Sequence, residues 1–247
     1  MKKHALLFIG ILVITISLVT CKKDKPVTIP VEFNSTTYVT LASYDSFGKP
    51  SNLLPPDAIS SNLMSYVNSI LIEESDLRPR HPELLSTSAI ADIAITQASD
   101  VFITFVSQIT TFTNGVAFYT YSTTAPPTSP DDIKTITYFF PNAGTGTKLK
   151  PGDKLKIGRF QPGTSIGFVL LKSAWDPTTK SLNNKVVHFC SNDVLNPEVD
   201  PALKKHAVLI NYAAENKVLI GFENSDRSSE RCDHDFNDVI LYATVTP

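Results

Sequence analysis

The sequence has little cysteine, tryptophan, methionine or charge. Its 247 residues include three cysteines, two methionines and one tryptophan, and charged side chains make up 19%. There is no basic excess either, because 22 Lys and Arg side chains stand against 24 Asp and Glu. Binding to nucleic acid needs a basic surface that displaces counterions. The composition therefore argues against nucleic acid as a partner.

An apolar run long enough to cross a bilayer as a helix is also missing. The run from Ala5 to Val19 has 15 residues, whereas a spanning helix needs roughly 20. Lys2 and Lys3 precede this run and Cys21 follows it, which is the order of a secretory signal. Leu18-Val19-Thr20-Cys21 resembles a lipoprotein box, although Gly, Ala or Ser is commoner than Thr before the cysteine.

We therefore predict a signal peptide at residues 1–20, acylation of Cys21 and export. The lipid anchor would make the membrane a partner and hold the protein in the cell envelope, with the outer membrane as the expected site. The domain would face either the periplasm or the cell surface. An uncleaved N-terminal membrane anchor is the alternative. Without Lys2 and Lys3, 20 basic and 24 acidic side chains give a net charge of −4.

Enzymatic signatures are scarce. The sequence contains no H-E-x-x-H and no C-x-x-C, the patterns of zinc peptidases and of dithiol chemistry. His234 lies between Asp233 and Asp235, but a histidine on an acidic loop is more often an exposed residue than an acid–base catalyst. We predict that the protein is not an enzyme.

Cysteine is too scarce for a disulfide framework. After acylation of Cys21, only Cys190 and Cys232 remain. An exported protein meets an oxidising compartment, so a Cys190–Cys232 disulfide is allowed. Two unpaired, buried thiols are the equally acceptable alternative, because the sequence does not give the Cα separation that a disulfide requires.

One helix and many short strands are predicted. A polar, proline-bearing tether follows Cys21 over residues 21–36, and a helical segment occupies residues 37–89. Its apolar stripe consists of Ile59, Leu63, Tyr66, Val67, Ile70 and Leu71, and Pro79 and Pro82 would prevent its continuation. Residues 90–247 contain nine short runs rich in β-branched and aromatic residues, with Pro-Gly turns at 151–152 and 162–163. The fold class is thus mainly β: an antiparallel β-sandwich of jelly-roll type with one N-terminal helix packed on it.

Acidic residues gather just before the last predicted strand. Asp233, Asp235 and Asn237 alternate along the chain, so their side chains can converge on one side of an extended segment. Asp238 follows, and Glu223, Asn224 and Asp226 lie at the end of the preceding strand. Carboxylate and amide oxygens are the ligands of calcium, so we predict calcium as a cofactor of this group.

An EF-hand loop and an ion-free loop are the two other interpretations of the acidic group. An EF-hand loop is excluded, because its sixth position would be Asp238 instead of Gly and its twelfth would be Thr244. The remaining alternative is an ion-free loop, in which Asp and Asn side chains cap turns and pair with Arg227 and Arg231.

Several stretches resemble the LruC-type family, a DUF4114-like group of exported bacterial domains of unknown function, often lipoproteins of the Bacteroidota type. The resemblance covers roughly Ile90 to Thr246. It rests on LKPGDKLKIGRFQPGTSIGFVLL, LNPEVDPALKKHAVLI and the ending GFENSDRSSERCDHDFNDVILYATV. Asn224 stands where the family usually has Asp. The resemblance implies an exported β-sandwich, strengthens the expectation of calcium, and implies no catalytic activity.

Aromatic residues near long loops are candidate ligand contacts. Trp175, Tyr119, Tyr121 and Tyr138 flank such loops, and flat aromatic faces near amides and carboxylates suit carbohydrate binding. The alternative is that Trp175 covers the core beneath its loop. We predict a non-catalytic surface binding or adhesion module for a glycan or protein ligand. A structural part of an envelope assembly is the alternative, and a glycan-active hydrolase is a remote one.

Overall fold

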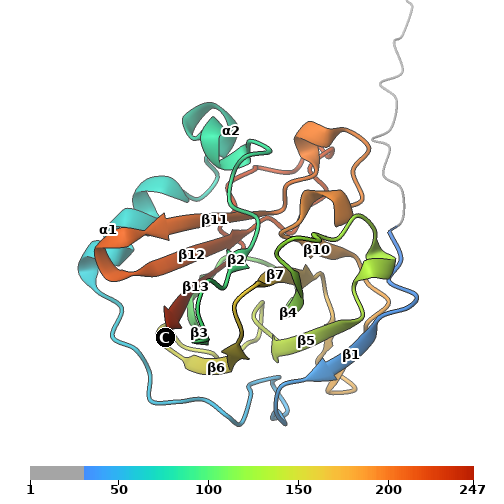
Figure 1. The fold of residues 1–247 in the computed structure, drawn as a ribbon. Helices are drawn as coiled ribbons and strands as arrows, with labels where there is room; N and C mark the ends of the chain where they lie inside the picture. The colour runs from blue at the N-terminus through green and yellow to red at the C-terminus, as the bar shows by residue number, and fades with distance from the viewer. Residues whose placement is uncertain (1–30) are drawn as a thin grey trace, which may run out of the picture.

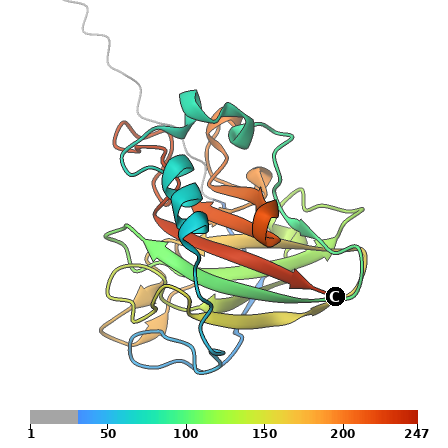
Figure 2. The ribbon, with the colours of Figure 1, turned by 90° about the vertical axis from the view of Figure 1, so that its left-hand side faces the viewer.

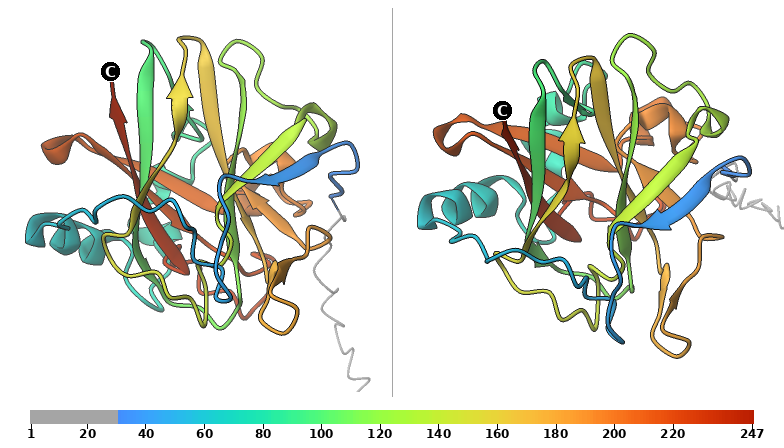
Figure 3. Two further views of the ribbon diagram at one scale, coloured as in Figure 1. Left: turned by 90° about the horizontal axis from the view of Figure 1, so that it is seen from below. Right: turned by 60° about the horizontal axis from the view of Figure 1, so that its bottom comes forward.

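Residues 31–247 are described by the computed structural model, and most of their strands belong to two β-sheets packed face to face (Figure 1). Figure 3 shows the two sheets from below. The first sheet has the order β1-β5-β4-β7-β10, with β2 also paired to β7. Its strands are β1 (Thr37–Thr40), β2 (Ile93–Ala94), β4 (Gly115–Ser122), β5 (Thr135–Phe140), β7 (Thr164–Leu171) and β10 (His188–Cys190).

The second sheet has the order β11-β12-β13-β3-β6. Its strands are β3 (Ser99–Gln108), β6 (Lys154–Phe160), β11 (Ala207–Tyr212), β12 (Lys217–Phe222) and β13 (Val239–Thr246). A small separate ribbon pairs β8 (Trp175–Asp176) with β9 (Ser181–Leu182). Short 3-10 turns connect these elements, namely η1 (Pro82–Leu85), η2 (Pro130–Asp132), η3 (Asp193–Leu195), η4 (Pro201–Leu203) and η5 (Ala213–Glu215).

The predicted fold class is confirmed: the protein is mainly β, and each of the nine predicted strands exists. The sequence did not predict β1, β2, β8 and β9, which have two to four residues each and are too short to show a clear alternation. β1 pairs with β5 in parallel, so the sandwich is not antiparallel throughout. The jelly-roll connectivity stays a prediction.

Apolar residues from both sheets fill the space between them. Phe118 and Phe168 of the first sheet and Ile103, Phe222 and Leu241 of the second belong to one buried cluster. The outer face of the first sheet is covered as well, since Ala117, Val169 and Leu171 belong to a second apolar group. Strands buried on both faces read as nearly continuous apolar runs, which explains the sequence SIGFVLL in β7.

The predicted helix forms as α1 (Ser61–Ile70), and the side chain of Ser60 caps its first turn by accepting a hydrogen bond from the backbone N–H of Leu63 at 3.0 Å. Figure 2 shows α1 lying against the second sheet, where Leu63 and Val67 pack against residues of β11, β12 and β13. A second, one-turn helix, α2 (Leu77–Arg80), contains Pro79. Proline is tolerated there because the first turn of a helix leaves its N–H groups unbonded.

The end of the predicted tether is in contact with the sandwich. Phe33 is buried and its ring stacks on His188 with centroids 4.5 Å apart. The predicted signal peptide and Cys21 lie outside the described residues. None of the helices found between residues 31 and 247 is long and apolar enough to span a bilayer.

The register of β12 and β13 brings the acidic residues together. Phe222 pairs with Val239, so Glu223 and Asp238 leave the two strands side by side. The intervening loop returns to the sheet over Gly221. A Cβ atom there would lie 2.5 Å from the carbonyl oxygen of Phe236 and 2.8 Å from Cδ1 of Leu71. Only glycine leaves room for this close approach.

Candidate cation site and neighbouring pocket

The acidic site begins at the junction of β12 and β13. Oδ2 of Asp238 accepts a hydrogen bond from the backbone N–H of Asn224 at 2.7 Å, and the carboxyl group of Glu223 lies close enough to raise the pKa of Asp238. Two carboxyl groups this close together need a shared proton or a cation, because two bare negative charges would repel.

Asp235 fixes the loop to the helical segment. Its buried carboxylate accepts hydrogen bonds from the backbone N–H of Glu74 at 2.9 Å and of Asn237 at 3.1 Å. The carbonyl of His234 accepts from the N–H of Leu77 at 3.0 Å. His234 and Phe236 both have φ of 60°, a left-handed conformation that non-glycine residues rarely adopt. The loop is therefore held in an unusual path by specific bonds on both sides.

Carboxylates and a thiol converge at the solvent side of this loop. Ligand atoms of Glu223, Cys232 and Asp233 all lie within 4.8 Å of one another. Glu223 and Cys232 are buried, whereas Asp233 is exposed. An ion entering from solvent would meet Asp233 first and the buried groups behind it.

The pKa values of three carboxyl groups in this site are raised. Burial, followed by the nearby Glu223, raises the pKa of Asp238 to about 9. Burial also raises the pKa of Asp235 to about 7 against the opposing hydrogen bond from Asn237, with Asp233 adding to the rise. The pKa of Glu223 is raised mainly by burial. Among residues 31–247, the ion pairs do not include any of these carboxylates.

One carboxylate oxygen in the group has no hydrogen-bond partner. Oε1 of Glu223 accepts from the N–H of Ser225 at 2.9 Å, but Oε2 is buried and unpartnered. Nδ2 of Asn237 is buried and unpartnered too. Buried polar atoms are nearly always hydrogen-bonded or bound to water or an ion. The donor set and this free oxygen therefore fit a cation.

The predicted ligands differ in their contacts. Asp233 lies close enough to raise the pKa of Glu223 and of Asp235, Glu223 and Asp235 raise the pKa of Asp238, and Asn237 lies beside Asp235. Two predicted ligands also make local hydrogen bonds: Nδ2 of Asn224 donates to Oγ1 of Thr110 at 2.7 Å, and Oδ1 of Asp226 accepts from the N–H of Ser228 at 2.9 Å. Their place among the cation ligands stays a prediction.

Of the two states left open for Cys190 and Cys232, the structure has the unpaired one: both thiols are free and buried. Cys190 lies in β10 within the apolar layer outside the first sheet. Cys232 lies in the acidic loop, with Sγ 3.4 Å from Nδ1 of His234. The two side chains belong to different packing environments, which the sequence could not distinguish.

Arg227 forms no ion pair with these acids among the described residues. Its buried guanidinium donates to Nδ1 of His234 at 3.2 Å and to the carbonyl of Lys205 at 2.8 Å. Burial and the positive charge of Arg227 lower the pKa of His234 to about 4. His234 is then a neutral hydrogen-bond acceptor, which does not suit the acid–base role considered for it.

A buried Glu–His pair lies behind the site, and the sequence did not predict it. Glu198 and His206 are both buried, and Oε1 of Glu198 lies 2.7 Å from Nε2 of His206. Nδ1 of His206 donates to the carbonyl of Glu223 at 2.9 Å, which fixes the backbone beneath the acidic group. The two residues are eight positions apart on different segments, so no local pattern indicates their contact.

The sequence also holds one pattern that is typical of serine nucleophiles. Gly163-Thr164-Ser165-Ile166-Gly167 matches G-x-S-x-G, which marks a nucleophile when it forms a turn between a strand and a helix. Here Ser165 is buried inside β7 and pairs with Tyr121 of β4 and Ala94 of β2. This context does not present its hydroxyl to a substrate.

The predicted aromatic contacts are mostly internal. Trp175 is 2% exposed and Tyr119 is 1% exposed, so neither offers a flat face to solvent. Tyr138 is buried as well. Tyr121 is partly buried, and its hydroxyl donates to the carboxylate of Asp92. The expectation of exposed aromatic faces is therefore corrected: the three tyrosines belong to the layer outside the first sheet, and Trp175 is buried as well.

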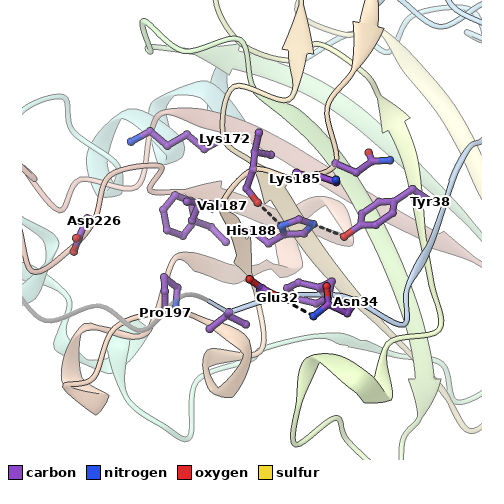
Figure 4. Close-up of a pocket in the computed structure, with 14 residues that line it drawn as sticks. Glu32, Asn34, Tyr38, Lys172, Lys185, Val187, His188, Pro197 and Asp226 are labelled. Atoms are coloured by element: carbon purple, nitrogen blue, oxygen red, sulfur yellow. Dashed lines mark hydrogen bonds between the residues drawn. The ribbon is translucent and has the colours of Figure 1, made fainter.

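A pocket of about 850 Å³ lies elsewhere, beside β10 (Figure 4). Tyr38 of β1 donates to Nε2 of His188 at 2.7 Å, and Nδ1 of His188 donates to the carbonyl of Val186 at 2.7 Å. β1 and β10 stand at opposite ends of the strand order, so the sheet must curl to bring these side chains together. Apolar walls come from Val31, Phe33, Val186, Val187, Phe189 and Pro197.

The polar rim of the pocket reaches the acidic site. Lys172 and Asp226 line one end, and Lys185, Asn184 and Glu32 line the rest. Among the described residues, no ion pair includes Lys172 or Lys185. Nζ of Lys172 lies 4.0 Å above the ring of Phe112. A cavity of this volume, with apolar walls and few polar groups, has the form of a small-ligand site.

Comparison with known proteins gives one family match, which covers part of the chain. No curated protein and no solved structure matches the sequence. Residues 160–246, from the end of β6 through β13, match the family described as "Domain of unknown function (DUF4114)".

Proposed function

We propose that the protein is a lipid-anchored envelope module that binds a ligand without catalysis and whose last strand is held by calcium. The unpartnered, buried Oε2 of Glu223 is the observation that carries the cation site. Asp233, Asp235 and Asp238 supply further oxygens close by, and Asn237 adds an amide. Calcium prefers such hard oxygen ligands. Bound there, it would offset the charge of the acids and tie the loop between β12 and β13 to the sheet.

The ligand of the module belongs in the pocket beside β10. Its walls are apolar, and its rim offers two lysines and two amides to a glycan or to a peptide segment of a protein. This places ligand binding next to the cation site, since Asp226 follows Glu223 closely and lines the pocket. The LruC-type assignment, acylation at Cys21 and the outer-membrane location complete the proposal, and they rest on the sequence.

Thermal unfolding tests the calcium site. The protein is compared in EDTA, in millimolar calcium and in magnesium. A ligand bound only by the folded state stabilises it by about 2.7 kcal/mol at a hundredfold excess over its dissociation constant. For a domain of this size we expect a rise in Tm of roughly 5 to 10 °C. Asp235→Ala should remove the rise. Coincident curves, in a sample that elemental analysis shows to be free of calcium, would refute the site.

A binding screen tests the pocket. The protein is applied to a glycan array and to a panel of matrix proteins in the presence of calcium. Lys185→Glu reverses one charge on the pocket rim, and Lys150→Glu is its matched control, because Lys150 is an exposed lysine that does not line the pocket. Loss of a hit only in Lys185→Glu supports the pocket. No hit at all, together with a stoichiometric crosslinked partner, favours a structural role in an envelope assembly.

A further inference from the structure

Cys232 gives the acidic site a second kind of ligand. Its Sγ, a carboxylate oxygen of Glu223 and one of Asp233 all lie within 4.8 Å of one another. Cys232 is 8% exposed and Glu223 is fully buried, while Asp233 faces solvent. The thiol of Cys232 is free, so its sulfur is available as a ligand.

A thiol changes which metals the site prefers. Calcium is bound by oxygen, whereas thiolate ligands select zinc and other softer metals. Zinc accepts mixed sets of Cys, His and carboxylate ligands, with a fourth position left for water or substrate. Glu223, Cys232 and Asp233 supply three ligands of this kind on one loop and one strand end.

An independent observation shows that the buried side of the group lacks a partner. Oε2 of Glu223 has no hydrogen-bond partner, although Glu223 is fully buried. The surroundings also hold the thiol in place: Sγ of Cys232 is 3.4 Å from Nδ1 of His234, and that nitrogen is itself fixed by Nε of Arg227 at 3.2 Å. Both positions are set before any ion arrives.

We propose that Glu223, Cys232 and Asp233 form a binding site for a thiophilic divalent metal of the zinc class. The proposal concerns the cluster of the proposed function, shares Glu223 with it, and adds metal selectivity. On binding, the Cys232 S–H bond breaks, a sulfur–metal bond forms, and the proton passes to solvent. No electron is transferred. Asp233 is the exposed ligand through which the ion enters.

Cobalt reports on the sulfur directly, because thiolate–cobalt(II) bonds absorb in the near ultraviolet. The full protein is freed of metal with EDTA, kept reduced, and titrated with cobalt(II). The band should appear in the wild type and disappear in Cys232→Ser, which keeps the carboxylates. Cys190→Ser is the matched control, since Cys190 is the other free buried thiol but lies outside the cluster. Zinc should displace cobalt and remove the band.

Two results would overturn the proposal: no band in the wild type at excess cobalt, or an undiminished band in Cys232→Ser. A second measurement avoids dependence on the folding of the variants. In the wild type, zinc should slow modification of Cys232 by a thiol reagent at least tenfold, as followed by mass spectrometry of the peptides, and leave Cys190 unchanged. Equal rates with and without zinc would also overturn it.

The outcome is separable from that of the calcium test. If calcium raises Tm but no thiolate band appears, the calcium site stands and the zinc-class site falls. If the band appears but calcium leaves Tm unchanged, the cluster is a zinc-class site and the calcium proposal falls. If both tests are positive, the two ions should compete, because they share Glu223.

Discussion

Two carboxylate groups lie at the second sheet, and their pKa values are shifted in opposite directions. Burial alone would raise the pKa of Asp57, but hydrogen bonds from Lys154 and Tyr242 lower it below its ordinary value. The hydroxyl of Tyr242 donates at 3.0 Å and that of Thr104 at 3.2 Å, and Lys154 forms an ion pair. In the acidic loop, burial raises the pKa of Asp238 to about 9.

The difference lies in the partners. Removing a carboxylate from water costs free energy at both places, and a nearby cation and hydrogen bonds offset the cost at Asp57. The chain itself provides that cation as Lys154. At Glu223 and Asp238 no ion pair forms among the described residues, and neighbouring carboxyls add to the rise in pKa that burial causes. These buried carboxyl groups without an ion pair are the physical reason to expect a bound cation there.

The largest loss of stability is expected from a substitution of Gly221, because the acidic loop packs directly on this residue. In Gly221→Ala, the new Cβ would overlap the carbonyl oxygen of Phe236, so the loop must move. We expect a loss of about 3 kcal/mol in the free energy of unfolding and loss of the response to calcium. Urea unfolding measures both. Gly163→Ala is the control, because a Cβ there meets nothing within 4 Å and only its positive φ adds a cost of about 1 kcal/mol. Equal costs would contradict the close approach.

Removing the charge of Asp57 should destabilise the fold. Asp57→Asn keeps the shape of the side chain but leaves the ammonium of Lys154 without its counter-charge. We expect a loss of about 2 kcal/mol at pH 7, between the values for exposed and fully buried pairs. The loss should be independent of calcium. A calcium-dependent loss would mean that the two acidic groups are coupled.

Lowering the pH should destabilise the protein by protonating His188 in the first sheet. Burial lowers the pKa of its imidazole to about 4, whereas the unfolded chain binds this proton near pH 6.5. The stability contributed by the neutral ring is therefore complete above pH 6.5 and is lost as the pH falls toward 4. We expect a loss of about 2 kcal/mol between pH 7 and 5 that His188→Gln lacks. Parallel pH profiles for the two proteins would show that His188 is not responsible.

Asp238→Asn should have the smallest effect on the free energy of unfolding, with the opposite sign to that of Asp57→Asn. Asp238→Asn keeps an oxygen that can accept from the N–H of Asn224 but removes a charge held among other acids. In EDTA at pH 7 we expect a gain of about 1 kcal/mol in the free energy of unfolding. In calcium the variant should gain less than the wild type does. A loss in EDTA would show that Asp238 already has a compensating partner.

Much of the fold could be predicted from local sequence patterns. Alternating and continuous apolar runs predicted nine of the strands, and the three- and four-residue spacing from Ile59 to Leu71 predicted α1. The Pro-Gly turns were also correct, with Gly152 and Gly163 at positive φ. The acidic group was predictable because β12 and β13 are neighbours in both sequence and sheet, so Glu223 and Asp238 had to emerge together.

The sequence by itself determined the strand-rich class, the apolar faces and the concentration of acids before the last strand, because each depends on residues close together in the chain. Tertiary structure alone decided the rest. Curling of the first sheet joined Tyr38 to His188 and formed the pocket, packing buried Trp175 and Tyr119, and the path of one loop separated Cys232 from Cys190 and placed it beside Glu223. These outcomes depend on contacts between segments distant in sequence, whose geometry is set by sheet curvature and register and leaves no periodic signal in the chain.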